Sequence, residues 1–264
     1  MDVMIYKIPY GGVKCMRFKL IFWLLCLAIS SVQAQIKPET IQPNEKMSAP
    51  GTNWFILEAR NAAYIFDASN GKMHGLISTS PHTPTIEPNL GRNEFYHADS
   101  YYSRGKYGDR TDILTITDFQ NLSPIYEINI PNKIAALAFR QYIGSMSDNK
   151  HIGISNLTPS QSVSIVNIEK REFITEISTP GCSLILPIDN NGFLTICGDG
   201  TLMLVSLDNQ GTEKNRLRSE KFFDVHEDAI FDRPIANKEG WTLFSHEGQF
   251  FHVSANNKNI NIDS

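Results

Sequence analysis

The sequence predicts an all-β fold, a β-propeller with about five blades, on three observations. The 264 residues include 15 Phe and 9 Tyr and few long helical patterns, a composition that favours strands. Apolar and polar residues alternate in short runs separated by polar or Gly-containing turns. Hairpins recur with markers at positions 67, 118, 167, 208 and 254, which lie 51, 49, 41 and 46 residues apart. A period of this size fits a four-stranded propeller blade, whereas a β-sandwich does not explain it.

The hairpins that set this period follow one another along the chain. In the three clearest, an Asp or Asn ends the first strand and lies ten residues before an Ile of the return strand: 62–67 with 73–77, 112–118 with 125–128, and 162–167 with 173–177. Looser copies occupy 202–208 and 249–254, and further strand-like runs fill the intervals at 152–156, 193–197 and 241–245. The fifth marker lies close to Ser264, so the sequence predicts either a five-bladed ring or the front part of a larger one, because a propeller closes to remove exposed sheet edges.

One hairpin carries a cysteine at the outer end of each strand. Cys182 and Cys197 flank two apolar runs joined by an Asp-Asn-Asn-Gly turn, and Gly198-Asp199-Gly200 predicts a second tight turn. The ends of an antiparallel hairpin lie side by side, so the spacing favours a cross-strand disulfide, which persists in an oxidising compartment. Two separate buried thiols are the alternative.

The N-terminus predicts export. The basic segment Met16–Lys19, the apolar run 20–29 and the small residues up to Ala34 have the order of a secretory signal, and the apolar run is shorter than a membrane span. We therefore expect a signal peptide over 1–34, with Met16 as a candidate true start, an N-terminal extension over 35–53 and an incomplete propeller over 54–264. Cleavage would remove Cys15 and Cys26 and leave the pair described above. The net charge of −4 favours neither nucleic acid nor an anionic membrane as a partner.

Several segments in order resemble the heavy (alpha) subunit of the quinoprotein amine dehydrogenases, and more closely the aromatic, or aralkylamine, enzyme. The segments are the cysteine hairpin with its ending 194–202, Tyr102–Asp112, Ser162–Asn167 and Phe222–Ile230. The resemblance covers about 54–255. Tyr107 stands where the family has a second Arg, and the family's propeller has seven blades, about two more than this chain.

The resemblance implies a division of labour between subunits in the periplasm. In the family, two heavy chains pair with two light subunits that carry tryptophan tryptophylquinone. That cofactor oxidises a primary amine to an aldehyde and ammonia and passes electrons to a cupredoxin such as azurin. No catalytic, cofactor-binding or metal-ligating residue is therefore expected in this chain. Trp54 and Trp241, the two Trp outside the predicted signal, are too separated in the repeat to suggest a quinone pair.

The candidate partner-binding loop is an aromatic and basic cluster. Tyr and Arg are enriched in interface hot spots, and the cluster holds Tyr101, Tyr102, Arg104, Lys106, Tyr107, Arg110 and the adjoining Asp112. The other interpretation is a solvated blade loop in which Arg110 and Asp112 pair locally. His246 and His252 could approach each other near the C-terminus, but without metal-ligand spacing the sequence favours ordinary strand histidines.

Three hypotheses for function follow. The first is the heavy subunit of a periplasmic amine dehydrogenase. The second is a stand-alone periplasmic propeller that acts as a binding scaffold, and the third is a non-functional fragment of the heavy chain.

Overall fold

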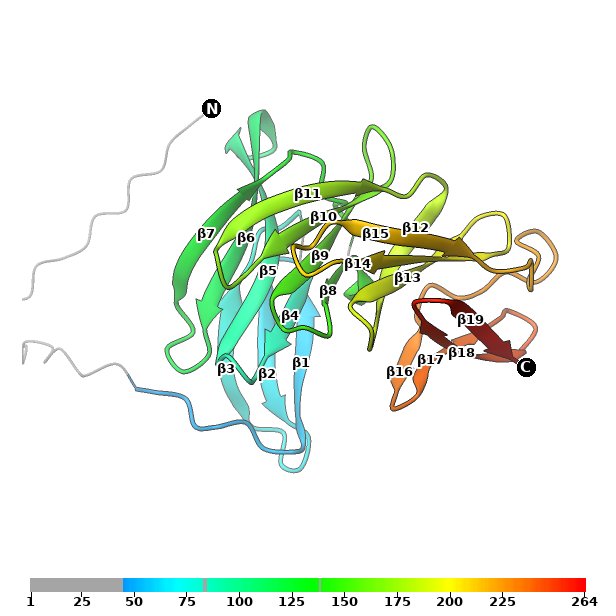
Figure 1. Cartoon of the computed structure of the whole chain (residues 1–264). Coiled ribbons are helices and arrows are strands. Elements are labelled where there is room, and N and C mark those ends of the chain that lie inside the picture. The colour runs from blue at the N-terminus through cyan, green and yellow to red at the C-terminus, as the bar shows by residue number, and fades with distance from the viewer. Residues whose placement is uncertain (1–44, 83–84, 138) are drawn as a thin grey trace, which may run out of the picture. The chain divides into compact units, whose positions relative to one another are not determined.

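A computed structural model describes residues 45–82, 85–137 and 139–264 (Figure 1). Residues 44–264 form one compact unit by their contacts. The predicted signal peptide lies outside the described residues. Of the predicted extension 35–53, residues 45–53 are described and contain no strand. In the part of the chain that the structure covers, no helix combines the length and apolar character that crossing a membrane requires.

The described residues form five successive antiparallel sheets, which we call blades 1 to 5. Blade 1 contains β1 (Trp54–Ala59), β2 (Ala62–Asp67) and β3 (Met73–Ser78). Blade 2 contains β4 (Ile86–Asn89), β5 (Glu94–Arg104), β6 (Tyr107–Asp118) and β7 (Pro124–Ile130). Blade 3 follows the short 3-10 helix η1 (Arg140–Tyr142) and contains β8 (Ile143–Ser145), β9 (His151–Asn156), β10 (Ser162–Asn167) and β11 (Glu172–Ser178). Blade 4 contains β12 (Cys182–Ile188), β13 (Gly192–Cys197), β14 (Leu202–Leu207) and β15 (Glu213–Arg218). Blade 5 contains β16 (Ile235–Asn237), β17 (Gly240–Phe244), β18 (Phe250–Asn256) and β19 (Asn259–Asp263).

The predicted all-β propeller with five blades is thereby confirmed, and the repeat has a local physical cause. Asp67, Asp118 and Asn167 end the strand that precedes the last strand of their blade, and Asp208 directly follows that strand in blade 4. The side chain of each accepts a backbone N–H group of the turn that follows. Asp67 accepts the N–H of Ser69 at 2.8 Å, and Asp208 accepts that of Gln210 at 2.9 Å. Such Asx turns explain why an acidic or amide side chain recurs at the period.

The fifth marker is two residues later than the sequence analysis placed it. β18 continues to Asn256, and the Asn256 side chain accepts the N–H groups of Lys258 and Asn259 at 3.0 and 3.1 Å. Ser254 lies within the strand and pairs with Asn261 across to β19. The alternation of β18 is the same at both positions, so the pattern of apolar residues could not separate them.

The hydrophobic core consists of four clusters, each between two successive blades. Ile65 of blade 1 packs with Phe95 of blade 2, and Leu114 of blade 2 packs with Ile152 of blade 3. Further along, Val163 lies in a cluster with Phe193, and Leu204 lies in a cluster with Leu243. Among the described residues, successive sheets therefore pack face to face through apolar clusters, and a blade gains much of its stability from its neighbours.

Candidate functional site

The β5–β6 hairpin of blade 2 extends beyond the sheets at the top of Figure 1. Its strands have 11 and 12 residues, whereas most other strands have six or seven. At the tip, Arg104 is opposite Tyr107 and Gly105 turns the chain with a φ of +74°. Tyr107 is 72% exposed and Tyr101 is 46% exposed. The hairpin thus presents aromatic rings and cationic groups to solvent, as the partner-binding hypothesis requires.

The root of the hairpin is fixed by Arg110 and Asp112. The Arg110 guanidinium donates from Nε and Nη2 to the two Asp112 carboxylate oxygens, both at 2.7 Å, and from Nη2 to the Ile134 carbonyl at 2.8 Å. Asp112 is buried and also accepts the N–H of Ile134 at 2.8 Å. A bidentate pair of this kind fixes orientation as well as adding energy. These two residues therefore join the hairpin to the loop that follows β7, as the local-pairing interpretation expects.

Four residues of the predicted partner-binding loop, Tyr102, Arg104, Arg110 and Asp112, consequently divide into two pairs. Arg110 and Asp112 are brought together in the root, where they hold structure. Arg104 is exposed near the tip, and Tyr102 contacts the ring of His82 edge-on, with centroids 5.2 Å apart. Beside them, partial burial and the carboxylates of Asp99 and Glu127 raise the pKa of Tyr101 to about 12. The Tyr101 phenol therefore stays neutral at neutral pH.

A buried polar network inside blade 2, which no sequence pattern predicts, supports the same hairpin. Asp99 is fully buried and pairs with His97, whose Nδ1 lies 2.7 Å from the carboxylate. The carboxylate also accepts the Thr115 hydroxyl and the N–H of Ser80, each at 2.7 Å. The His97 side chain is 2% exposed, which leaves no path for a substrate. No local pattern in the sequence shows that the polar residues His97, Asp99 and Ser100 are buried inside a strand.

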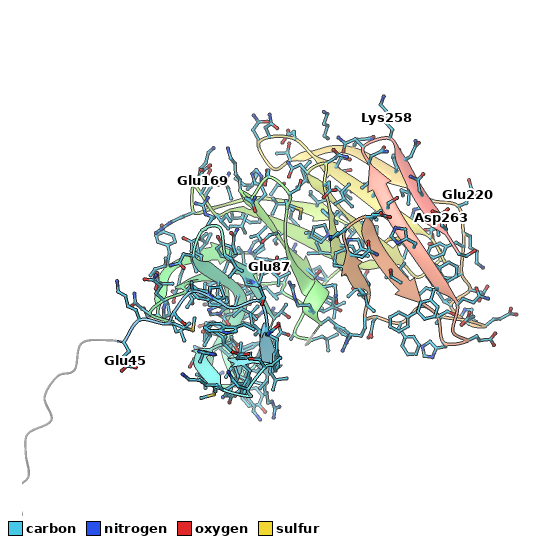
Figure 2. The ribbon with its side chains drawn as sticks, turned by 90° about the horizontal axis from the view of Figure 1, so that it is seen from below. Glu45, Glu87, Glu169, Glu220, Lys258 and Asp263 are labelled. Carbon is cyan, nitrogen blue, oxygen red and sulfur yellow. A yellow bond between two sulfur atoms is a disulfide. The ribbon has the colours of Figure 1, made fainter. Side chains whose placement is uncertain are left out.

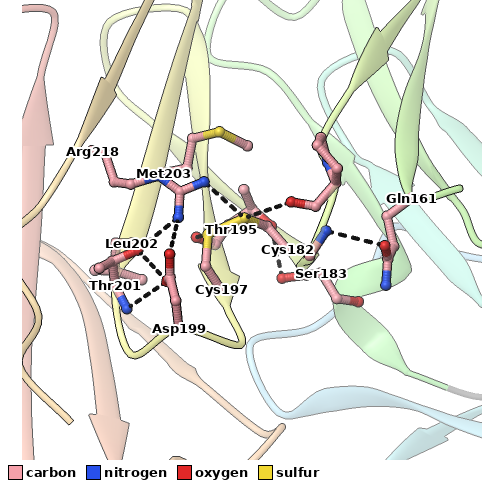
Figure 3. The surroundings of a disulfide bond; sticks show 12 residues. Gln161, Cys182, Ser183, Thr195, Cys197, Asp199, Thr201, Leu202, Met203 and Arg218 are labelled. Atoms are coloured by element: carbon pink, nitrogen blue, oxygen red, sulfur yellow. Dashed lines mark hydrogen bonds and ion pairs between the residues drawn. A yellow bond between two sulfur atoms is a disulfide. The ribbon is translucent and has the colours of Figure 1, made fainter. Parts of the chain in front are cut away.

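The disulfide is present as predicted (Figure 3). Cys182 and Cys197 are directly opposite in the β12–β13 ladder and their sulfur atoms are bonded, with Cα atoms 3.9 Å apart. Both cysteines lie in the core between blades 3 and 4. On one side of the bond, the Gly181 N–H donates to the Gln161 side chain of the preceding blade at 3.1 Å. The bond therefore braces the edge at which blade 4 meets blade 3.

A polar cluster covers the disulfide from the other side. Arg218 of β15 donates to Asp199 at 2.7 Å and to the Thr201 hydroxyl at 2.9 Å, and its Nη2 lies 3.7 Å from the Cys182 sulfur. The hydrogen bond from Thr201, with the nearby charge of Arg218, lowers the pKa of Asp199. Gly200 has a φ of +88°, which confirms the predicted tight turn. The disulfide is therefore structural, and the charged side chains of Arg218 and Asp199 lie over it.

The remaining candidates are separate in the structure. The ring of His246 stacks on Phe231 with centroids 4.0 Å apart, whereas His252 lies near Asn237 and Glu239. Within the described residues, no group of three His, Cys, Asp or Glu side chains could hold a metal ion. Trp54 stacks on His74 in blade 1, and Trp241 donates to the Pro187 carbonyl. Two indoles held in different blades do not fit a cross-linked quinone pair.

The fold and this site first define a class of protein. It is a β-propeller with a disulfide in one blade and with buried polar groups that hold its hairpins in place. Among the described residues, the β5–β6 hairpin tip exposes aromatic and basic side chains. This arrangement is typical of a scaffold that presents surfaces to other molecules.

The comparison with known proteins makes the class specific. The sequence profile of the methylamine dehydrogenase heavy chain (MADH) family matches residues 53–263, so this chain belongs to that family. The chain is 26% identical over 200 residues to the methylamine dehydrogenase heavy chain of Methylobacillus flagellatus, covering 75% of this chain and 50% of the relative. It is 26% identical over 196 residues to the heavy chain of Methylophilus methylotrophus, covering 73% and 48%. The chain therefore spans about half the length of these relatives.

Solved structures agree on the fold. A protein of unknown function from Desulfotomaculum acetoxidans superposes with a TM-score of 0.55 at 13% identity, covering 81% of this chain and 65% of the other. The dihydro-heme d1 dehydrogenase NirN superposes with a TM-score of 0.53 at 12% identity, covering 86% and 47%. At these identities the likeness concerns the fold.

Proposed function

We propose that this chain serves as the heavy, non-catalytic subunit of an amine dehydrogenase. The observation that carries the proposal is the family match over residues 53–263. In this role the chain binds and positions a light subunit. The light subunit carries tryptophan tryptophylquinone, which oxidises a primary amine to an aldehyde and ammonia.

The division of labour agrees with the chemistry of the described residues. The His97–Asp99 pair is buried, and the two Trp side chains lie in separate blades. A proton-transfer group that no substrate can reach takes no part in catalysis, so the His97–Asp99 pair is no candidate catalytic site. The exposed tip of the β5–β6 hairpin is the surface we assign to the light subunit, since Tyr101, Arg104 and Tyr107 are available there and the root is rigid.

Three finer features belong to the same proposal. The disulfide supports an oxidising compartment, here the periplasm, reached through the signal peptide predicted over 1–34. The resemblance in the cysteine hairpin supports aralkyl amines as substrates. A cupredoxin such as azurin is the proposed electron acceptor, and two heavy chains with two light chains the proposed assembly.

Co-purification tests this function. The full chain carrying an affinity tag is recovered from the periplasm of its own host, and its partners and amine-dependent dye reduction are measured. We expect a smaller Trp- and Cys-rich partner and dye reduction with 2-phenylethylamine. Recovery of the chain without such a partner, and without amine-dependent reduction, would contradict the proposal.

Matched variants locate the contact with the light subunit. Arg104→Ala combined with Tyr107→Ala removes the tip of the β5–β6 hairpin, and Lys170→Ala combined with Arg171→Ala removes exposed cations of the β10–β11 turn. We expect the first pair to weaken light-subunit binding by about tenfold or more, as hot-spot losses do, and the second to leave it unchanged. Equal effects of the two pairs would show that the hairpin tip is not the contact.

The second candidate function is a stand-alone binding scaffold. It is favoured by the four inter-blade cores, which lie entirely within residues 44–264. A soluble monomer that unfolds cooperatively in the absence of any light subunit, and that shows no amine-dependent activity in the host extract, would select this function over the first.

A further inference from the structure

An apolar hollow of about 330 Å³ lies beside the disulfide, apart from the β5–β6 hairpin. One wall is the end of the β12–β13 hairpin, with Leu184 and Cys197. A second wall is the connection that precedes blade 3, with Phe139 and Tyr142. The third is the connection from β15 to β16, residues 219–234, which we call the blade 4–5 loop (Figure 1). The hollow is therefore formed by three segments that the fold brings together.

The blade 4–5 loop is held in place on both sides. The Phe222 N–H donates to the Gly200 carbonyl of blade 4 at 3.0 Å. Within the loop, the Asp228 N–H donates to the Asp224 carbonyl at 2.9 Å and closes a turn. The Asp228 side chain in turn accepts the N–H of Glu247, in the β17–β18 turn of blade 5, at 2.8 Å. The hollow is thus formed before a partner binds, which favours docking with little change of shape.

The wall contributed by this loop is apolar and reaches solvent. Val225 and Phe231 line the hollow and are 36% and 37% exposed, whereas Phe223 in the same wall is buried. The guanidinium of Arg233 lies over the Phe139 ring, 4.5 Å from its centroid, so this aromatic wall already accommodates a cation. Exposed apolar side chains around a hollow with a polar rim mark an interaction site.

The rim of the hollow is acidic. Residues 219–234 contain five carboxylates against two cations, although the whole chain has a net charge of only −4. Lys221 pairs with Asp224 at 2.7 Å and Arg233 pairs with Asp232 at 3.2 Å, so carboxylates of the loop itself neutralise both cations. The other carboxylates of the loop are Glu220, Glu227 and Asp228. A partner that approaches the hollow therefore meets a negative potential.

We propose that this hollow is a docking site for a basic segment of a partner polypeptide. The segment inserts an aliphatic or aromatic side chain into the hollow and places Lys or Arg side chains against Glu227 and Asp228. An anchor that fills a pocket supplies much of the affinity of an interface, and complementary charge selects the partner and accelerates association. The site shares no residue with the β5–β6 hairpin and does not depend on the amine dehydrogenase proposal.

Other occupants fit these observations less well. The carboxylates of the rim repel nucleic acid and anionic membrane surfaces. Residues 35–44 of this chain contain one Lys and one Glu, so they bring no excess of positive charge. A second copy of the chain exposes Arg104 and Lys106 at its hairpin tip, and the oligomeric state distinguishes it from a separate partner.

Peptide selection on the full chain tests the proposal. A phage-displayed library of random heptapeptides is selected against the immobilised protein at low salt, and enriched peptides are synthesised, labelled and measured by fluorescence anisotropy. We expect sequences with two or more Lys or Arg and one aliphatic or aromatic residue. Their affinity should fall by about tenfold or more in about 0.5 M NaCl, because salt screens exposed charges. No enrichment, or enrichment of acidic or uncharged sequences, would overturn the proposal.

Matched variants locate the bound peptide. Glu227→Lys reverses a charge of the rim and Val225→Ser removes an apolar side chain of the wall, and each should weaken the basic peptides by about tenfold. Glu169→Lys makes the same charge reversal in the β10–β11 turn, and Figure 2 shows Glu169 on the other side of the view from Glu220 of the loop. This control should leave the affinity unchanged. Equal effects of Glu227→Lys and Glu169→Lys would overturn the proposal, because they would show attraction to the net charge alone.

Two further measurements exclude loss of structure and self-docking. Asp228→Asn removes a charge but keeps an oxygen that can accept the Glu247 N–H, so circular dichroism should be retained while peptide affinity falls severalfold. Unchanged affinity would contradict the assigned contact. Sedimentation velocity of the unmodified protein should show that any self-association is insensitive to Glu227→Lys. A dimer that Glu227→Lys dissociates would mean that a second copy occupies the hollow, and would overturn the proposal of a separate partner.

Discussion

Blade 4 and blade 1 are built on the same hairpin pattern and end in opposite environments. All six residues of β14 in blade 4 are buried, with Leu204 facing blade 5 and Val205 facing blade 3. In blade 1, Ile65 and Ile77 are buried against blade 2. Its other face is open, with Phe55 46% and Leu57 53% exposed.

The difference shows that a blade's sequence specifies two apolar faces, whereas burial depends on the neighbours. On the open face of blade 1, cross-strand pairing places Phe55 beside Phe66, Leu57 beside Tyr64, and Tyr64 beside Leu76. The rings of Phe55 and Phe66 stack with centroids 5.8 Å apart. A contiguous apolar sheet face of this kind marks an interaction surface.

The largest effect is expected in the core of blade 4. Leu204→Ala should lower the free energy of unfolding by about 2–5 kcal/mol, because a fully buried leucine loses its transfer energy and leaves a cavity. Leu57→Ala, the matched change in blade 1, should cost below about 0.5 kcal/mol, as exposed sites do. Urea unfolding followed by tryptophan fluorescence measures both. Equal losses would mean that blade 1 is covered in solution.

Removal of the disulfide should have a slightly smaller effect. The double change Cys182→Ser and Cys197→Ser opens a loop with a sequence separation of 15, which corresponds to about 3 kcal/mol in the chain-entropy account. Denaturant titration with and without a reductant measures the loss. If a reductant lowers the unfolding midpoint of the unmodified protein but not that of the double variant, the assignment is confirmed. A lower midpoint of the double variant on adding reductant would point to another cause.

The sequence predicts blades well because their signals are local. Asp67, Asp208 and their counterparts cap turns within a few residues, and Cys182 and Cys197 are paired by a single hairpin. The extent of β5 could not be predicted, because His97 and Asp99 are buried by contacts with Thr115 and Ser80 that no local pattern records. For the same reason, the pairing of Arg110 with Asp112 remained one of two interpretations. The open edge of β1 depends on where strands of other segments lie.

Self-association gives a further contrast between the blades. Leu57→Lys places a charge on the open face of blade 1 and should reduce concentration-dependent association without lowering stability appreciably. The same change at Leu217, a partly buried residue that packs on the core between blades 4 and 5, should instead destabilise the protein. Light scattering across a concentration series measures the first effect. Association that Leu57→Lys does not change would show that another surface is responsible.

The pH dependence should have opposite signs in the two blades, and it is the smallest effect. Burial raises the pKa of Glu58 above its usual 4.5, so its favourable contribution is present below that value and is lost as pH rises through the folded-state pKa. The Thr201 hydroxyl and Arg218 lower the pKa of Asp199, whose contribution is present above 3.8 and is lost as pH falls. Between pH 3 and 7, the free energy of unfolding of Glu58→Gln should therefore increase relative to that of the unmodified protein as pH rises. The free energy of unfolding of Asp199→Asn should decrease relative to that of the unmodified protein over the same range. If the two variants showed the same dependence on pH, the assignment would be contradicted.

Residue-resolved hydrogen exchange along β1 tests the central claim most directly. If β1 is an open edge, the Phe55 and Leu57 amides, which face β2, should be protected, and the Ile56 and Glu58 amides should exchange at rates close to those of exposed loops. In blade 4, β13 has partners on both sides, so consecutive amides from Phe193 to Ile196 should all be protected. Uniform protection along β1 in the isolated protein would contradict the account, because it would mean that a strand already occupies the edge.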